Sequence, residues 1–173
     1  SSIAVPGLLM FDQEIRSDYR NFYFVWAQSF FLTLGFTNFT KVLVGRPRPY
    51  LYANNASDDY KLKKDNRKSF FSGHTSISAV SWFLMASMYE DYKPGSNILP
   101  YLWTSAFLVP AYTAYCRYDA GKHFLSDVVM GYLVGSTIGV LVPKWYTNNN
   151  NKVNLSFILQ PTGKIKTRLT YEF

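Results

Sequence analysis

Between Ser69 and Tyr89 the chain reads SFFSGHTSISAVSWFLMASMY, without any Asp, Glu, Lys or Arg. Three further stretches lack these four residue types and are rich in apolar ones: Asn21–Thr40, Pro94–Cys116 and Val128–Pro143. A helix of 20 residues rises about 30 Å, so the first three stretches could each cross a membrane or fill a bundle, whereas Val128–Pro143 is short for a span. The predicted fold class is therefore all-α.

The links between these stretches predict how the helices are arranged. Asp91–Gly95 and Arg117–Gly121 are short, and short links make consecutive helices antiparallel neighbours. The link from Arg46 to Lys68 is longer and polar. An up-and-down bundle of this kind brings the end of the first helix, the start of the second, the end of the third and the start of the fourth to one end of the molecule.

The two histidines of the chain both fall at these helix ends. His74 follows Ser72-Gly73 where the second helix is expected to begin, and His123 follows Arg117 where the fourth is expected to begin. Imidazole has an unperturbed pKa of about 6.5, so it can act as nucleophile or proton carrier near neutral pH. We therefore expect a catalytic site at this end of the bundle.

Basic residues are also expected at this end of the bundle, and they indicate that the ligand is a phosphate. Arg48 and Arg117 carry guanidinium groups, which form planar, charge-assisted bonds to phosphate oxygens. Lys41 adds a point charge. The backbone N–H groups of Gly73 and His74, at a helix N-terminus, would face the same anion.

His123 and Asp127 are four residues apart, so on a helix their side chains share a face and the carboxylate can accept a ring N–H. That bond would fix the imidazole tautomer and leave the other ring nitrogen free to attack phosphorus, forming a covalent phosphohistidine. His74 would protonate the leaving alkoxide and later activate water. The residues alone thus favour phosphoryl transfer.

The three clusters together resemble the signature of the type 2 phosphatidic acid phosphatase superfamily. They read Lys41, six residues, Arg48-Pro49; Ser72-Gly73-His74; and Arg117, five residues, His123, three residues, Asp127. The same signature occurs in bacterial class A acid phosphatases, glucose-6-phosphatase and vanadium-dependent haloperoxidases. Phe71 stands where the family normally has proline, and Cys116 where it normally has serine.

The resemblance implies an antiparallel helical bundle of the phosphatase and haloperoxidase type. It implies that phosphate is held by Lys41, Arg48, Ser72, Gly73 and Arg117, with His123 as nucleophile, Asp127 as its orienting partner and His74 as general acid. No metal or cofactor is expected, although vanadate or phosphate can occupy the site as ligand. The implied substrate is a phosphomonoester or pyrophosphate of a membrane lipid, at a bacterial inner membrane with the active site facing the periplasm.

Other interpretations stay open at this point. A vanadium-dependent haloperoxidase would hold vanadate in the same cradle, and a soluble periplasmic acid phosphatase would act on phosphomonoesters non-specifically. A helical membrane protein could use its basic segment only to dock anionic lipids. A zinc triad of His74, His123 and Asp127 is disfavoured because the nearby arginines would repel a cation.

The positive charge of the chain is local. Net charge is +7, and residues 41–68 hold eight Lys or Arg against three Asp, which predicts attraction for anions. The sequence has no further signs of a nucleic-acid-binding module, so no nucleic-acid partner is expected. The positive-inside rule would put residues 41–68 in the cytoplasm, in conflict with the periplasmic site that the resemblance implies.

We expect one helical catalytic domain over residues 1–147, with further helices upstream, because the sequence begins without Met. Residues 148–173 are expected to form an asparagine-rich linker and a short β-hairpin. A run of four asparagines breaks the helical pattern, and alternating apolar residues then flank a Pro-Thr-Gly turn.

Overall fold

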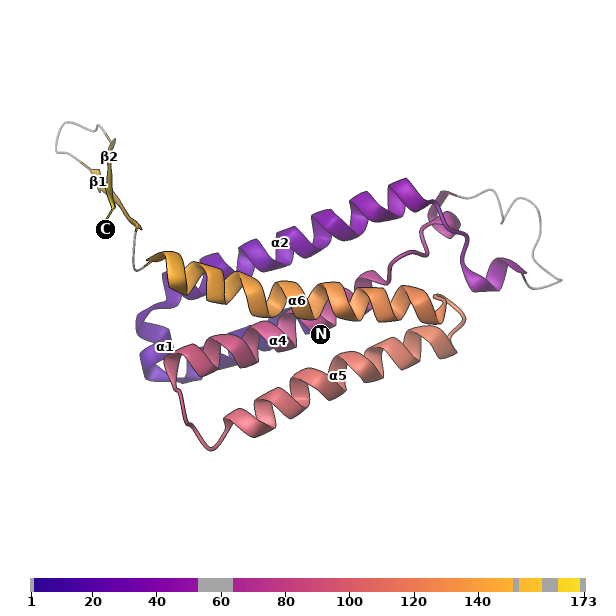
Figure 1. Ribbon diagram of the computed structural model, residues 1–173, viewed down its shortest axis with the longest axis horizontal. Coiled ribbons are helices and arrows are strands. Elements are labelled where there is room, and N and C mark those ends of the chain that lie inside the picture. Colours follow the sequence, from indigo (N-terminus) through magenta and orange to yellow (C-terminus); the bar gives the residue numbers. More distant parts are fainter. Residues whose placement is uncertain (1, 53–63, 151–152, 160–164, 172–173) are drawn as a thin grey trace.

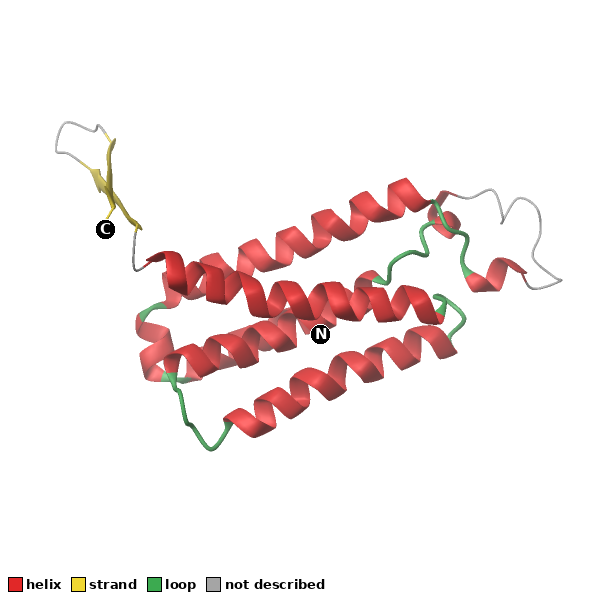
Figure 2. Ribbon diagram, viewed as in Figure 1, coloured by secondary structure: helices red, strands yellow, loops and turns green. Residues whose placement is uncertain are grey.

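The computed structural model describes residues 2–52, 64–150, 153–159 and 165–171. Its four long helices are α2 (Tyr19–Val44), α4 (Gly73–Tyr92), α5 (Leu99–Asp119) and α6 (Leu125–Asn150). They alternate in direction along one axis, with α4 and α6 in the middle and α2 and α5 on either side (Figure 1). The predicted all-α, up-and-down bundle is confirmed, as the predominance of helix in Figure 2 shows.

A short N-terminal segment that the sequence did not predict packs beside the start of α2 and the C-terminal half of α4. It consists of the 3-10 helix η1 (Ser2–Phe11) and the helix α1 (Gln13–Ser17). Asp12 caps α1, and its carboxylate also pairs with Lys93 at the C-terminal end of α4. The segment adds apolar side chains to the core cluster of α2 and α4, namely Leu9 and Ile15 beside Phe22, Val25, Leu84, Met85, Met88 and Tyr89.

Helix α4 is the central element of the bundle. It packs against α2, α5, α6 and η1, and nearly all of its side chains as far as Tyr89 are buried. Such a helix is expected to be apolar or small on every side, which is the composition of the stretch that begins at Ser69. Because α4 is surrounded, the ends of its neighbouring helices that lie beside its N-terminus come close together.

Helix α6 packs on α4 through glycines four residues apart, Gly131, Gly135 and Gly139. A β-carbon on Gly135 would lie 2.3 Å from the carbonyl oxygen of Ser76, and one on Gly131 would lie 2.6 Å from that of Ser72. Residues four apart share a helix face. The glycines therefore let the two backbones approach more closely than any side chain would allow.

A row of residues on one face of helix α2 packs toward α4. The buried members of this row are four residues apart: Val25, Ser29, Thr33 and Thr37. Thr37 Oγ1 lies 3.2 Å from Ser76 Oγ of α4, within hydrogen-bond distance. The next position in the row is Lys41, so the packing of α2 carries its amino group to the start of α4.

Helix α6 is longer than predicted. It begins at Leu125, contains Pro143 and continues to Asn150, into the asparagine run that was expected to begin the linker at residue 148. An internal proline removes a helical hydrogen bond and bends the helix. Val142 and Tyr146, on either side of Pro143, pack against the core cluster, and helices in proteins are stabilised mainly by such packing.

The C-terminal tail contains two strands, β1 (Val153–Leu159) and β2 (Ile165–Tyr171). They pair antiparallel, with Val153 opposite Tyr171. The predicted turn falls on residues 160–164, which lie outside the described residues. The hairpin as a unit therefore stays a prediction.

Within the described residues one helix is long and apolar enough to cross a membrane, Leu125–Tyr146, with a mean hydropathy of 1.7. This is the stretch that the sequence predicted to be too short, because its charge-free part covers only part of α6. The stretches now seen as α2, α4 and α5 do not meet the same criterion in the part of the chain that the structure describes.

Candidate active site

Four helix ends meet at one end of the bundle: the C-terminal ends of α2 and α5 and the N-terminal ends of α4 and α6 (Figure 1). All eight site residues predicted from the sequence lie on these ends or on the links that join them, namely Lys41, Arg48, Ser72, Gly73, His74, Arg117, His123 and Asp127. The up-and-down topology therefore gathers them, as expected. Their catalytic roles stay predictions.

Ser72 forms the N-cap of α4. Its Oγ accepts the N–H of Thr75 at 3.5 Å and the hydroxyl of Thr75 at 3.0 Å, and its own N–H donates to the carbonyl oxygen of Asp127 at 3.0 Å. The side chain of Ser72 is fully buried, so its hydroxyl is engaged inside the protein. The first N–H groups of a helix have no partner within it, which leaves those of Gly73 and His74 available to an anion.

The amino group of Lys41 lies over the start of α4. Its Nζ is 3.1 Å from the point that a β-carbon on Gly73 would occupy, so the glycine leaves room for it. Burial lowers the pKa of Lys41, and the charges of Arg48 and Lys68 lower it further. Cations that crowd one another in this way are stabilised by a bound anion.

His74 is exposed at the mouth of the site. Burial of part of its ring lowers the pKa of His74, and electrostatic interaction with the neighbouring groups Arg117, Lys41, His123 and Lys122 lowers it further. These side chains come from different helices and links, yet each is close enough to act on one imidazole. The predicted cations and both histidines therefore lie close enough to interact electrostatically.

Arg48 lies on the link that follows α2. Its backbone N–H donates to the carbonyl oxygen of Asn66 at 3.0 Å, which ties the two ends of the long link together. In the described part of the chain the buried Nε of Arg48 has no hydrogen-bond partner. A buried donor without a partner is costly, and a phosphate oxygen would satisfy it.

Replacing Arg48 with methionine is expected to weaken phosphate binding by about 10- to 100-fold, because a hydrogen bond to a charged group contributes about 1.5–3 kcal/mol. Inhibition by inorganic phosphate measures this directly. Arg67→Met is the matched control, since Arg67 is an exposed arginine on the same link. Equal inhibition of the two variants would remove Arg48 from the binding site.

His123 is buried, with 5% of its side chain exposed. Its Nδ1 lies 2.8 Å from the carbonyl oxygen of Ser69 and 3.7 Å from the nearer carboxylate oxygen of Asp127. A carbonyl can only accept, so Nδ1 carries the proton and Nε2 keeps a free lone pair. The hydrogen bond predicted between ring and carboxylate is thus replaced by one to a backbone carbonyl, which the chain before α4 places closer to the ring.

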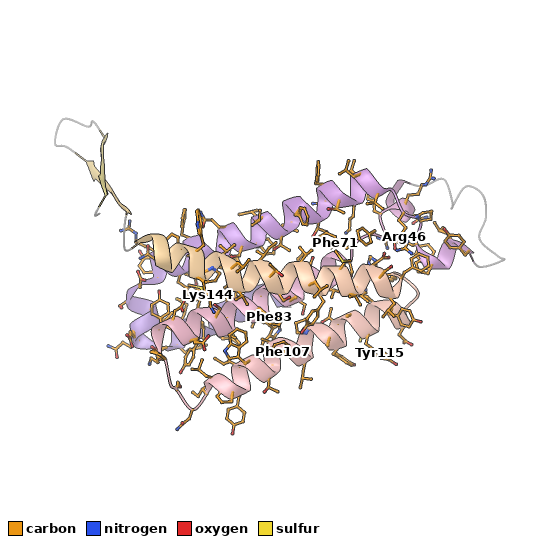
Figure 3. All side chains as sticks on the ribbon, in the orientation of Figure 1. Arg46, Phe71, Phe83, Phe107, Tyr115 and Lys144 are labelled. Carbon is orange, nitrogen blue, oxygen red and sulfur yellow. The ribbon has the colours of Figure 1, made fainter. Side chains whose placement is uncertain are left out.

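The carboxylate of Asp127 is fully buried and accepts three hydrogen bonds. Arg46 Nη1 donates to one oxygen at 2.8 Å, and Ser69 Oγ at 2.5 Å and the N–H of Phe124 at 3.0 Å donate to the other. Arg46 also donates to Ser126 Oγ at 2.8 Å, and its guanidinium carbon lies 4.0 Å from the centre of the Phe124 ring. Figure 3 shows Arg46 beside the start of α6.

Arg46 and Ser69 were not singled out by the sequence analysis. A carboxylate on the buried face of a helix must be paired and hydrogen-bonded, and this rule calls for partners of Asp127. It does not say which of the many cations and hydroxyls supply them. The pairing depends on the path of the link after α2, which the sequence pattern does not reveal.

The structure locates the two residues that depart from the family signature, Phe71 and Cys116. Phe71 is buried, and its ring lies 5.8 Å from that of Phe36, so it fills the junction between α2 and the start of α4 (Figure 3). Cys116 is exposed on α5 beside Tyr112. Among the described residues no group of three or more His, Cys, Asp or Glu side chains is placed to hold a metal ion.

Comparison with models of known protein families identifies the family of this chain. Residues 22–151 match the model of the PAP2 superfamily, a range that includes all eight predicted site residues. The match covers well over half of the chain, which therefore belongs to the PAP2 superfamily. The resemblance seen in the three sequence clusters is confirmed.

Several curated proteins are similar to this chain. A PA-phosphatase related-family protein of Dictyostelium discoideum is 34% identical over 130 residues, which are 72% of this chain and 47% of that protein. Phospholipid phosphatase 1 of Rattus norvegicus is 28% identical over 135 residues, 65% of this chain and 47% of that protein. Phospholipid phosphatase 1 of Mus musculus is 29% identical over 129 residues, with coverages of 61% and 45%. The chain thus spans about half the length of these relatives, and no solved structure matches it.

Proposed function

We propose that this chain is the catalytic part of a phosphatase that hydrolyses a phosphomonoester or pyrophosphate of a membrane lipid through a phosphohistidine. The observation that carries the proposal is the setting of His123. Its Nδ1 is engaged by a carbonyl, which leaves Nε2 as a nucleophile at the end of the bundle where Lys41, Arg48 and Arg117 gather. The names of the relatives support a phospholipid substrate.

The proposed reaction has two steps. In the first, the cations hold the phosphate, Nε2 of His123 attacks phosphorus, and the ester P–O bond breaks as the leaving oxygen takes a proton from His74. In the second, neutral His74 takes a proton from water, the resulting hydroxide attacks phosphorus, and the P–N bond breaks. Phosphate leaves, and both histidines return to their starting protonation states.

A groove between α5 and α6 supports a substrate with a hydrocarbon chain. It has a volume of about 350 Å³ and an almost wholly apolar lining, made by Ala111, Ala114, Tyr115, Tyr118, Leu125, Val128, Val129, Tyr132 and Leu133. Tyr118 directly follows Arg117, and Leu125 is two residues after His123. An amphiphile whose phosphate is held by the cations therefore has an apolar path for its tail.

Filling the groove is expected to remove the preference for long tails. Ala114→Phe should raise KM for long-chain phosphatidic acids by about tenfold, the effect of losing about 1.4 kcal/mol of apolar burial, with little change for short-chain ones. Leu108→Phe is the control, because Leu108 is exposed on α5 outside the groove. A chain-length series of substrates checks the prediction, and an unchanged preference in Ala114→Phe would contradict it.

We also propose a membrane location with α6 as a spanning segment. Support comes from the apolar length of Leu125–Tyr146 and from exposed large apolar side chains on α2 and α5, for example Phe31, Phe39 and Leu108. The bacterial inner membrane and the periplasmic orientation stay predictions from the sequence. The relatives named above come from eukaryotes.

Phosphate release from matched substrates tests the function. In detergent micelles the protein is expected to hydrolyse phosphatidic acid with a higher kcat/KM than a soluble aryl phosphate, to keep its activity in EDTA, and to be inhibited by vanadate. Equal kcat/KM values would favour a non-specific acid phosphatase. Vanadate-dependent bromide oxidation without phosphate release would favour a haloperoxidase, and loss of activity in EDTA would overturn metal independence.

The lowered pKa of His74 predicts a difference between two pH profiles. A general acid must be protonated, so kcat/KM, which reports the free enzyme, should fall as pH rises above a value below the usual 6.5. A bound phosphate dianion favours the imidazolium, so the corresponding fall in kcat should come at higher pH. Lys122→Met removes one of the charges that lower the pKa and should move the kcat/KM limb upward. Coincident limbs for kcat and kcat/KM would contradict this role.

A further inference from the structure

We propose that Arg46 and Ser69 are positioning residues for His123, and that they set its tautomer and direction through a hydrogen-bonded chain that includes Asp127. The inference rests on the proposed phosphatase function. It differs from a direct pairing of ring and carboxylate, because the 3.7 Å separation of Nδ1 and the carboxylate is too long for a hydrogen bond. Asp127 then acts on the ring through other groups.

Ser69 supplies the atom that orients the imidazole, its carbonyl oxygen, 2.8 Å from Nδ1. Two bonds fix Ser69 itself. Its N–H donates to the carbonyl oxygen of Arg46 at 3.0 Å, and its Oγ donates to Asp127 at 2.5 Å. The residue is fully buried, so water does not compete for these bonds. A hydroxyl and an amide thus hold the carbonyl against the ring.

Arg46 joins three separate segments at this point. Its backbone carbonyl holds Ser69, before α4, and its guanidinium holds Ser126 and Asp127, in the first turn of α6. The same group packs over the ring of Phe124, the residue after His123. One residue just after α2 therefore holds Ser69 through its backbone and the first turn of α6, next to His123, through its side chain.

The buried carboxylate explains why an arginine is needed. Asp127 is fully buried, and Arg46 pairs with it at 2.8 Å. Removing one partner of a buried pair leaves an uncompensated charge, which the site would relieve by moving or by taking up a proton. Either response would weaken the bond from Ser69 Oγ to Asp127, and with it the hold on the carbonyl that orients His123.

The tautomer of His123 can be observed directly, because the chain has two histidines and ¹⁵N-histidine labelling therefore gives signals from two rings. His74→Gln assigns them. We expect neutral His123 to be protonated at Nδ1 in the wild type and to become a mixture of tautomers in Arg46→Met and in Ser69→Ala. Protonation at Nε2 in the wild type, or unchanged signals in both variants, would overturn the inference.

Kinetics separate positioning from binding. Arg46→Met and Ser69→Ala are each expected to lower kcat by about 100-fold, the cost of misplacing a reacting group by about 1 Å, with KM changed by less than about twofold. Arg67→Met is the matched control, since it removes an exposed arginine of the same link that has no place in the chain of bonds to His123, and it should keep kcat. Added guanidinium should restore part of the activity of Arg46→Ala, whereas Arg46→Lys should stay impaired because an ammonium lacks the planar fork.

The outcomes distinguish this inference from the proposed function. If the wild type hydrolyses lipid phosphates and Ser69→Ala does so equally well, the positioning role is wrong and the phosphatase assignment stands. If the wild type hydrolyses none of the substrates, the proposed function fails, and the labelling experiment still decides which group orients the ring. Ser69→Ala removes a single oxygen and leaves the backbone bonds in place, so it tests the inference even if Arg46→Met does not fold.

Discussion

Replacing His123 with alanine is expected to lower kcat on the order of 10⁶-fold, the scale seen when the nucleophile of a covalent mechanism is removed. The variant keeps Lys41, Arg48 and Arg117, so phosphate should still bind. Phosphate release under single-turnover conditions, together with inhibition by inorganic phosphate, measures the two effects separately.

The His74→Asn variant is the matched comparison. Loss of a general acid costs about 10²- to 10⁴-fold and matters least when the leaving group is already acidic. His74→Asn should therefore retain much of its activity on an aryl phosphate, whereas His123→Ala should lose activity on every substrate. If His74→Asn were the more damaged variant on the aryl ester, the two histidines would have to exchange roles.

The second large effect is expected at the contact between α4 and α6. Gly135→Ala should lower the free energy of unfolding by about 3 kcal/mol, because the new β-carbon would meet the backbone oxygen of Ser76 and neither backbone can move without displacing its helix. Activity should fall with stability, since α6 carries Asp127 and is preceded by His123. Denaturant unfolding in micelles measures the loss.

Gly35→Ala on α2 provides the control for this prediction. It is also a glycine within a helix, but a β-carbon there would meet nothing within 4 Å. The substitution should be neutral or stabilising by up to about 1 kcal/mol through helix propensity. If Gly135→Ala were as stable as Gly35→Ala, the close packing of α4 and α6 would be disproved.

The sequence predicts the bundle and the gathering of its polar clusters for a simple physical reason. Charge-free stretches of helical length joined by short links leave few arrangements, and alternation then brings Lys41, His74 and Arg117 together. The four-residue spacing of Gly131, Gly135 and Gly139 is a further signal in the sequence. It would have indicated which face of α6 meets α4.

Other features depend on tertiary contacts that no local pattern encodes. The end of α6 was misplaced because the helix, held by the packing of Val142 and Tyr146, continues into the asparagine run that was expected to break it. The partner of the His123 ring was misassigned because helical spacing points to Asp127, whereas the fold brings in a backbone carbonyl from Ser69, 54 positions earlier in the chain. Arg46 was missed for the same reason.

The proposed mechanism is decided by which residue carries the phosphoryl group during turnover. The protein is mixed with a labelled lipid phosphate, quenched in alkali, which preserves phosphohistidine, and digested for mass spectrometry. We expect a phosphoryl group on His123 in the wild type and on no residue in His123→Ala. A wild-type protein that turns over while phosphorylated at His74, or at no residue, would contradict it.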